Sequence, residues 1–166
     1  MKKFFLILGG VFAAILVIGG IAAVILIPQA LRLNRDATAY IQDNVPKIVV
    51  NWNVQELFNR GTPQLISMIT THGGAERLFS MFSRLGKFKH LDEPKGSVGF
   101  SAFTGADTAI LGNYTATAQF ENGDATIRIQ LRRFNNSWQI NGFFINSDVF
   151  LQPVSGKTPQ PGKRPH

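Results

Sequence analysis

The sequence contains no cysteine. A lipoprotein is therefore excluded, while the compartment stays open, because a chain without cysteine suits reducing and oxidising surroundings alike. Histidine is scarce too, because the chain has three: His72, His90 and the last residue, His166. A metal site needs three or four ligands, so we expect no metal. No glycine-rich phosphate loop follows a predicted strand, and no Ser-His-Asp order with a nucleophile turn is present.

Acidic residues are the minority charge: 10 against 17 lysines and arginines, for a net charge of +7. Such an excess is typical of nucleic-acid binding, but 7 of the 17 basic residues flank the apolar run or lie in the tail. Residues 36–151 hold 10 basic and 10 acidic residues and are formally neutral. Nucleic-acid binders gather Lys and Arg on one face, whereas the only compact pair here is Arg132–Arg133. We expect no nucleic-acid partner.

Charge is absent altogether from Phe4 to Ile27, a run of 24 apolar residues. At about 1.5 Å per residue, a helix of this length measures about 36 Å, which exceeds the ~30 Å hydrocarbon core of a bilayer. The sequence therefore predicts a transmembrane signal anchor over residues 1–30. A cleaved signal peptide is the alternative, although its apolar core is shorter, at about 7 to 15 residues.

Charges beside this run slightly favour a cytoplasmic N-terminus, because the terminal amine adds to Lys2 and Lys3. The chain is then expected to be a single-pass protein of the bacterial inner membrane and cell envelope, with its C-terminal domain in the periplasm. Small residues on one face of the span would let helices pack closely. These residues are Gly9, Ala13, Gly20 and Ala23.

Residues 31–91 carry helical periodicity, and Pro46 is expected to break or kink the first helix near Asn44–Val45. Asn53 and Glu56 have the spacing of a capping box, and Thr62–Pro63 restarts a helix. The last helix is expected over Ala75 to Leu85. Residues 152–166 contain four prolines and are expected to be a disordered basic tail.

The second half alternates as antiparallel strands do. Asn122-Gly123 and Asn135-Asn136 mark turns between the strands. One face is expected to be apolar and the other polar, as in a sheet that helices cover on one side. The expected inward residues are Tyr114, Ala116, Ala118, Phe120, Ile127, Ile129, Leu131, Trp138, Ile140, Gly142 and Phe144.

Helices followed by a bent antiparallel sheet that ends in Trp138-x-Ile140-x-Gly142-x-Phe144 resemble the nuclear transport factor 2-like superfamily, also called the cystatin-like α+β cone. The resemblance covers about residues 36–148, and small exported bacterial domains are similar at this last strand. It implies an α+β fold, with the domain at residues 31–151, but no particular activity. The superfamily includes ketosteroid isomerase-like enzymes, pocket-binding proteins and non-catalytic membrane-anchored scaffolds.

Catalytic and cofactor-binding residues are not expected. An enzyme of this fold needs ionisable groups inside the cone, but the inward rows are apolar and Tyr114 is their only polar group. A carboxylate tuned for acid–base work needs burial or a paired neighbour. The acids instead fall at turns and helix ends, as do Asp92, Asp107 and Asp124.

These observations favour a non-enzymatic scaffold or interaction subunit of an envelope complex, bound to a protein partner or to a second copy. The alternative is binding of an apolar small molecule or lipid in the cone, and a ketosteroid isomerase-like enzyme ranks third. A filled cone favours the scaffold, whereas an open apolar cavity favours the ligand binder. The outward sheet face would carry the interaction, through Thr117, Gln119, Arg128 and Arg132.

Overall fold

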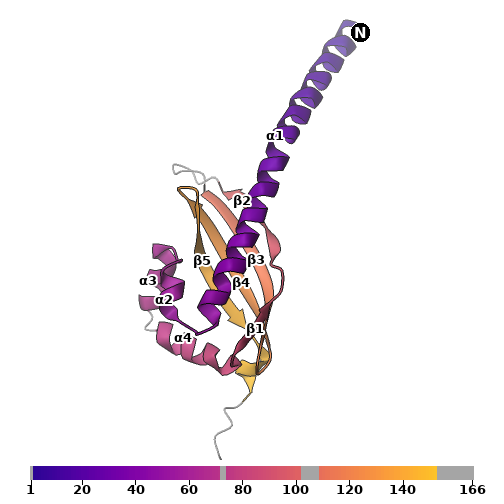
Figure 1. Cartoon of the computed structure of the whole chain (residues 1–166). Coiled ribbons are helices and arrows are strands. Elements are labelled where there is room, and N and C mark those ends of the chain that lie inside the picture. Colours follow the sequence, from indigo (N-terminus) through magenta and orange to yellow (C-terminus); the bar gives the residue numbers. More distant parts are fainter. Residues whose placement is uncertain (1, 72–73, 102–108, 153–166) are drawn as a thin grey trace, which may run out of the picture.

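The structure, a computed structural model, describes residues 2–71, 74–101 and 109–152. It is an α+β fold in which helices lie against a curved antiparallel sheet (Figure 1). The helices are α1 (Lys2–Val49), α2 (Val54–Phe58), α3 (Pro63–Thr71) and α4 (Ala75–Phe82), with short 3-10 turns η1 (Ser83–Leu85) and η2 (Asp148–Leu151). The strands are β1 (Phe88–Leu91), β2 (Lys95–Ser101), β3 (Ala109–Phe120), β4 (Asp124–Phe134) and β5 (Ser137–Asn146).

The sheet has the order β1-β3-β4-β5, and β2 also pairs with β3, so β5 is the last strand on one side. Both predicted turns form. Gly123 has a φ of 148° between β3 and β4, and Asn135 and Asn136 have φ values of 46° and 64° between β4 and β5. Two central residues at positive φ match the twist of the flanking strands, which is why asparagine suits this hairpin.

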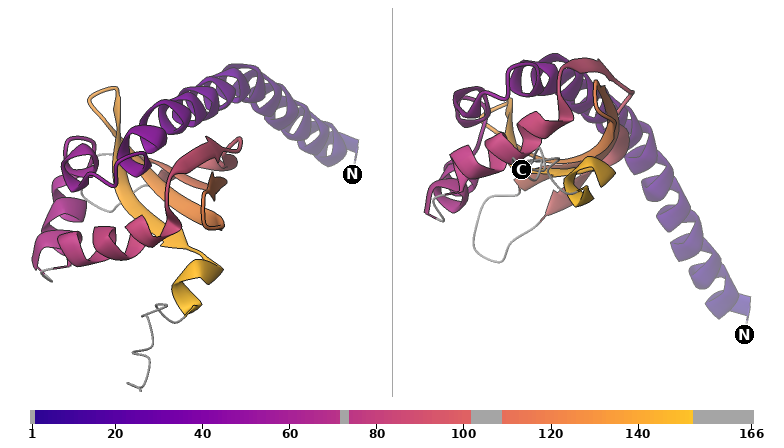
Figure 2. Two further views of the ribbon diagram at one scale, coloured as in Figure 1. Left: turned by 60° about the horizontal axis from the view of Figure 1, so that its bottom comes forward. Right: turned by 90° about the horizontal axis from the view of Figure 1, so that it is seen from below.

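The core lies where the C-terminal half of α1 crosses the concave face of the sheet (Figures 1 and 2). Ile41, Val45 and Ile48 of α1 are 0–1 % exposed. They belong to one cluster with the inward rows of β3 and β4, where Ile127 and Ile129 are fully buried. Burial of each such side chain stabilises the fold by about 1.5–3 kcal/mol. The space between α1 and the concave face of the sheet is therefore filled by side chains.

The expected break at Pro46 is wrong, because α1 continues through this residue to Val49, while the alternative of a kink there stays a prediction. Proline in a helix interior removes one hydrogen bond and costs about 3 kcal/mol. Val45 and Val49 lie on either side of it and are 1 % and 0 % exposed. Their packing on the sheet offsets the local cost of the proline, so the helix continues past it.

The expected transmembrane anchor is also wrong. Within the described ranges, no helix has both the length and the apolar character needed to cross a bilayer. The run from Phe4 to Ile27 is the first part of the 48-residue α1, whose second half is amphipathic and packs on the sheet.

The last strand changes face partway along. Leu131 pairs with Ile140 but Gln130 pairs with Gly142, so Asn141 is the extra residue of a β-bulge. An extra residue reverses the alternation of inward and outward side chains beyond it. Phe143 is therefore buried at 9 % exposure, whereas Phe144 is 54 % exposed. The expectation that Phe144 points inward is wrong, while Trp138 and Ile140, before the bulge, are buried as predicted.

Some expectations concern parts of the chain outside this description. The disordered tail was expected over residues 152–166, and all of it after Gln152 lies outside the described residues. The same holds for His72 and Asp107. Of the four small residues expected to pack helices together, the surroundings of Gly20 alone are described, and a Cβ added there would meet nothing within 4 Å.

Candidate functional site

A hollow of about 510 Å³ lies between α3, α4 and β5, and we call it the β5 groove. Helix α3 contributes Leu65, Met68 and Ile69 to its walls. Helix α4 contributes Leu78, Phe79, Met81 and Phe82, and β5 contributes the stretch from Asn141 to Ile145. The groove is thus an apolar opening beside the core between α1 and the sheet.

Helix α3 is held beside β5 by the residues that precede it. Thr62 is 1 % exposed, and its backbone N–H donates to the Ile140 carbonyl at 2.8 Å. Its hydroxyl oxygen accepts from the Leu65 N–H at 3.3 Å, as an N-cap should, and donates to Asn141 Oδ1 at 3.1 Å. The predicted Thr62–Pro63 helix start is therefore confirmed, and it fixes one wall of the groove.

The β-bulge places the groove on the open edge of β5. Phe143 belongs to the inner face of the sheet and Phe144 to the outer face, yet both line the same hollow. Gly142 contributes as well; a Cβ on it would approach Phe144 Cε2 to 3.1 Å and Gln130 Oε1 to 2.7 Å. Side chains of both faces can border one hollow only if it extends over the strand edge between them.

Among the described residues that line the β5 groove there is no charged side chain. Its polar side chains are the amides of Gln130 and Asn141. Ligand pockets typically measure about 300–1,000 Å³ and combine apolar walls with a few polar groups. This groove matches that pattern in size and in chemistry.

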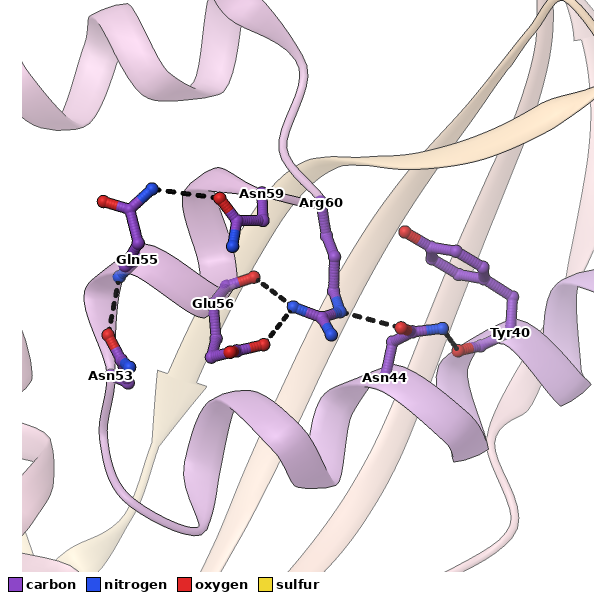
Figure 3. Close-up of polar contacts among 7 residues, drawn as sticks. All are labelled: Tyr40, Asn44, Asn53, Gln55, Glu56, Asn59 and Arg60. Carbon is purple, nitrogen blue, oxygen red and sulfur yellow. Dashed lines mark hydrogen bonds and ion pairs between the residues drawn. The ribbon is translucent and has the colours of Figure 1, made fainter.

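A polar cluster braces α2 against α1 (Figure 3). The Arg60 guanidinium donates to Asn44 Oδ1 at 2.7 Å and pairs with the Glu56 carboxylate. Burial raises the pKa of the neighbouring Tyr40 hydroxyl, and the positive charge of Arg60 opposes this shift. Since the Arg60 carbonyl accepts from the Ile140 N–H at 2.8 Å, the cluster also fixes β5.

The predicted capping box is half right. Asn53 caps α2, because its side-chain oxygen accepts from the Gln55 N–H at 2.9 Å. The Glu56 carboxylate instead pairs with Arg60. Sequence spacing cannot distinguish these partners, because a glutamate near a helix start also lies one turn from residue 60.

Tyr114 does not face an acid. It is 3 % exposed, and its hydroxyl donates to Asn34 Oδ1 at 2.7 Å. Burial raises its pKa, and a hydrogen bond with the Thr38 side chain opposes the shift.

The described histidine, His90, lies beside an acid at the surface, with its Nε2 atom 3.6 Å from Oδ1 of Asp92. In the described part of the chain, no three His, Cys, Asp or Glu side chains gather as a metal site.

The four residues predicted to carry an interaction lie on the outer face of β3 and β4. Thr117, Gln119 and Arg128 are exposed, whereas Arg132 is half-buried. Thr117 pairs with Thr126 and Thr115 with Arg128, so Thr117 and Arg128 are near neighbours. Arg132 lies four residues farther along β4, about 13 Å away at ~3.3 Å per residue. The structure therefore places Thr117 near both Gln119 and Arg128, with Gln119 and Arg132 at opposite ends of the row.

The residues of the β5 groove were missed by the sequence analysis. A usable signal was present in the sequence of Pro63–Thr71, which has no charged residue. In the structure, Met68 of this helix is 57 % exposed. A helix without a charged face is normally buried or covered by another molecule. The other half of the groove had no sequence signal, since it depends on the bulge at Asn141.

Three comparisons with known proteins place no relative beside this chain: no family model, no curated protein and no solved structure matches it. The resemblance to the nuclear transport factor 2-like superfamily stays a prediction.

Proposed function

We propose that this chain is a non-enzymatic binding protein whose site is the β5 groove and whose ligand is apolar. The observation that carries the proposal is the hollow of about 510 Å³, whose walls are apolar and, in the residues that the structure describes, carry no charge. A filled interior was the feature that favours a scaffold over a ligand binder, and side chains of α1 and the sheet do fill the space between them. The proposal therefore depends on the β5 groove beside that core, whose volume and apolar walls suit a ligand.

An apolar ligand suits these walls better than a polar one. Burial of apolar surface contributes about 25 cal/mol per Å², so about 200 Å² of a ligand gives about 5 kcal/mol before the cost of association is subtracted. A charged group placed there would lose its hydration and gain only the amides of Gln130 and Asn141. The expected ligand therefore puts its apolar part in the hollow and keeps charge at the rim.

Methionine methyl groups allow a direct test, because two of the three methionines, Met68 and Met81, line the groove. We would label the methionine methyl groups with carbon-13 and titrate the chain with decanoate as an apolar probe. The Met68 and Met81 signals should shift together and saturate, whereas the Met1 signal serves as the reference.

The matched variants are Leu78→Glu and Leu151→Glu. Leu78 lines the groove at 41 % exposure, and Leu151 lies outside it at 83 % exposure. The first change puts a carboxylate at the mouth of the groove and should abolish the saturable shifts, while the second should leave them unchanged. Shifts that do not saturate, or that are equal in both variants, would refute the proposal.

A second candidate is protein contact through the outer face of the sheet, which the exposure of Thr117, Gln119 and Arg128 favours. In the described residues no acid pairs with Arg128 or Arg132. Their charges therefore suit an acidic surface on a partner or on a second copy. Arg132→Glu should weaken such an assembly without unfolding the domain; an unchanged sedimentation profile of the native complex would argue against this candidate.

A further inference from the structure

The β5 groove includes a strand edge that is only partly paired. Strand β5 is the last strand of the sheet, and β4 covers one of its sides. On the other side, Gly61 forms an isolated parallel bridge with Ile140. The Thr62 N–H donates to the Ile140 carbonyl, and the Ile140 N–H donates to the Arg60 carbonyl, both at 2.8 Å. The chain thus already adds a short extended segment to this edge.

Beyond this bridge the edge has no partner in the described part of the chain. The backbone leaves the edge at Pro63 and turns into α3. Asn141–Asn146 then continue along the groove without a neighbouring strand on that side. Proteins protect an unpaired strand edge with charged residues, with proline or with a covering helix or loop, or they use the edge to bind another strand.

We infer that the β5 groove binds an extended segment of a partner protein, which adds to β5 as a further strand and inserts one apolar side chain between α3 and α4. This inference rests on the proposed function and names the class of its ligand. The stretch Asn141–Asn146 is six residues long, so at ~3.3 Å per residue it pairs with a segment of about six residues.

Alternation in the added strand fixes where its side chains go. One residue points to the inner side, where Met68, Leu78 and Phe143 line the hollow. The residues before and after it point to the outer side, toward Phe144. Phe144 is paired across the strands with Arg128, which is exposed.

Charge favours an acidic residue at this outer position. Among described residues Arg128 forms no ion pair, and no acid lines the groove. Arg128 lies on β4, two strand spacings or about 9.6 Å from the added strand, so the arginine and the acid meet where both side chains extend over β5 toward each other. The segment that fits has a large apolar residue next to an aspartate or glutamate. Main-chain hydrogen bonds and the apolar anchor would supply affinity, and Arg128 would supply specificity.

The test starts with a displayed library of random heptapeptides selected against the full 166-residue chain. Enriched peptides should combine a large apolar residue with an adjacent acid. Titration calorimetry on the best synthetic peptide then gives its dissociation constant for each protein variant. The Met68 and Met81 methyl signals report whether the peptide occupies the groove.

Methylation of the peptide's main-chain nitrogens, one at a time, is the decisive measurement. A methyl group removes a donor and blocks strand pairing, so it should weaken binding by about tenfold or more at every second residue and little at those between. An even response along the peptide would overturn the strand-addition inference.

Protein variants locate the contact. Leu78→Glu should weaken peptide binding by at least about tenfold, and Leu151→Glu by less than about twofold. Arg128→Glu should weaken binding about three- to tenfold, whereas Lys95→Glu, an equal charge change on β2 across the sheet, should leave it nearly unchanged. Equal effects of the two charge changes would show that net charge, rather than position, governs binding.

The outcomes separate this inference from the proposed function. If no peptide is enriched but decanoate still shifts Met68 and Met81, the peptide inference is refuted and apolar binding stands. If neither probe binds, both are refuted. If added peptide has no effect because the chain self-associates, and Leu78→Glu restores the monomer in sedimentation, a second copy occupies the edge and the foreign-partner inference is refuted.

Discussion

At the scale of single residues, Trp52 has the least expected backbone. Its φ is 48°, in the left-handed region that bulky residues rarely adopt, just after the end of α1. The ring stacks on Phe120 with centroids 5.4 Å apart and contacts Phe82 at 5.7 Å. Glycine would suit the backbone better. At this position the aromatic packing of tryptophan therefore outweighs the backbone preference for glycine.

Trp52→Gly should destabilise the domain although it relieves backbone strain. Loss of a packed tryptophan costs about 3–5 kcal/mol, while relief of the left-handed conformation returns about 1–2 kcal/mol. The expected net loss is about 1–4 kcal/mol in urea unfolding monitored by circular dichroism. Asn136→Gly, at a φ of 64° but with an exposed side chain, is the control and should stay within about 0.5 kcal/mol. A Trp52→Gly protein as stable as the parent would contradict the packing argument.

The two tyrosines predict how stability depends on alkaline pH. Burial raises the pKa of Tyr40 and of Tyr114 above the ordinary value of 10.0, so the folded state holds both protons more tightly than the unfolded state does. Their stabilisation is complete below pH 10 and is lost as the pH rises through the folded pKa values.

Tyr114→Phe should therefore make the fall of unfolding free energy above pH 10 less steep. It should also lower stability at neutral pH by about 0.5–1.5 kcal/mol, since the hydrogen bond to Asn34 is lost. Denaturant titrations from pH 7 to 11 provide the measurement, and Tyr40→Phe is the parallel control. An unchanged slope in both variants would show that neither hydroxyl is protected.

At the scale of elements, β5 shows how one extra residue redirects a strand. The bulge at Asn141 buries Phe143 and exposes Phe144, the reverse of simple alternation. It also brings residues of both faces to the β5 groove. Strand period alone predicts the first half of β5 correctly and the second half incorrectly.

Alanine replacements on either side of this reversal test it. Phe143→Ala should cost about 3–5 kcal/mol of unfolding free energy, the usual loss for a buried phenylalanine, and Phe144→Ala less than about 1 kcal/mol. Both are measured by urea denaturation, and each serves as the control for the other. The opposite order of effects would restore the uninterrupted alternation and remove the groove from the strand edge.

At the scale of the whole molecule, α1 joins two regions of different character. Its described side chains before Leu33 are exposed, including Phe12 and Ile18 at 63 % and 67 %. From Ala37 onward it supplies one wall of the core. The fold therefore depends on the second half of this helix and not on the first.

Two truncations separate these halves. A chain that starts at residue 31 should keep its melting temperature within about 3 °C, because a shift of that size corresponds to less than about 1 kcal/mol. A chain that starts at residue 50 should not fold, since Ile41, Val45 and Ile48 leave the core. Circular dichroism melting gives both results. Unfolding of the first variant would show that the core extends farther along α1.

The sequence by itself determined the elements whose cause is local. Alternation located β3 and β4, asparagine and glycine located both hairpin turns, and Thr62–Pro63 located the start of α3. It also determined which side chains of β3 and β4 are buried, because every second residue shares a face. These features depend on neighbours within a few positions, so the order of residues contains them.

Tertiary structure decided the features that depend on contacts between distant residues. Packing of α1 on the sheet carries the helix through Pro46, and pairing of β4 with β5 places the bulge at Asn141. The β5 groove needs Met68, Leu78 and Phe143 together, which lie far apart along the chain. Local preferences do not predict that these residues come together, because the energy of long-range packing exceeds local propensities and decides which of them are realised.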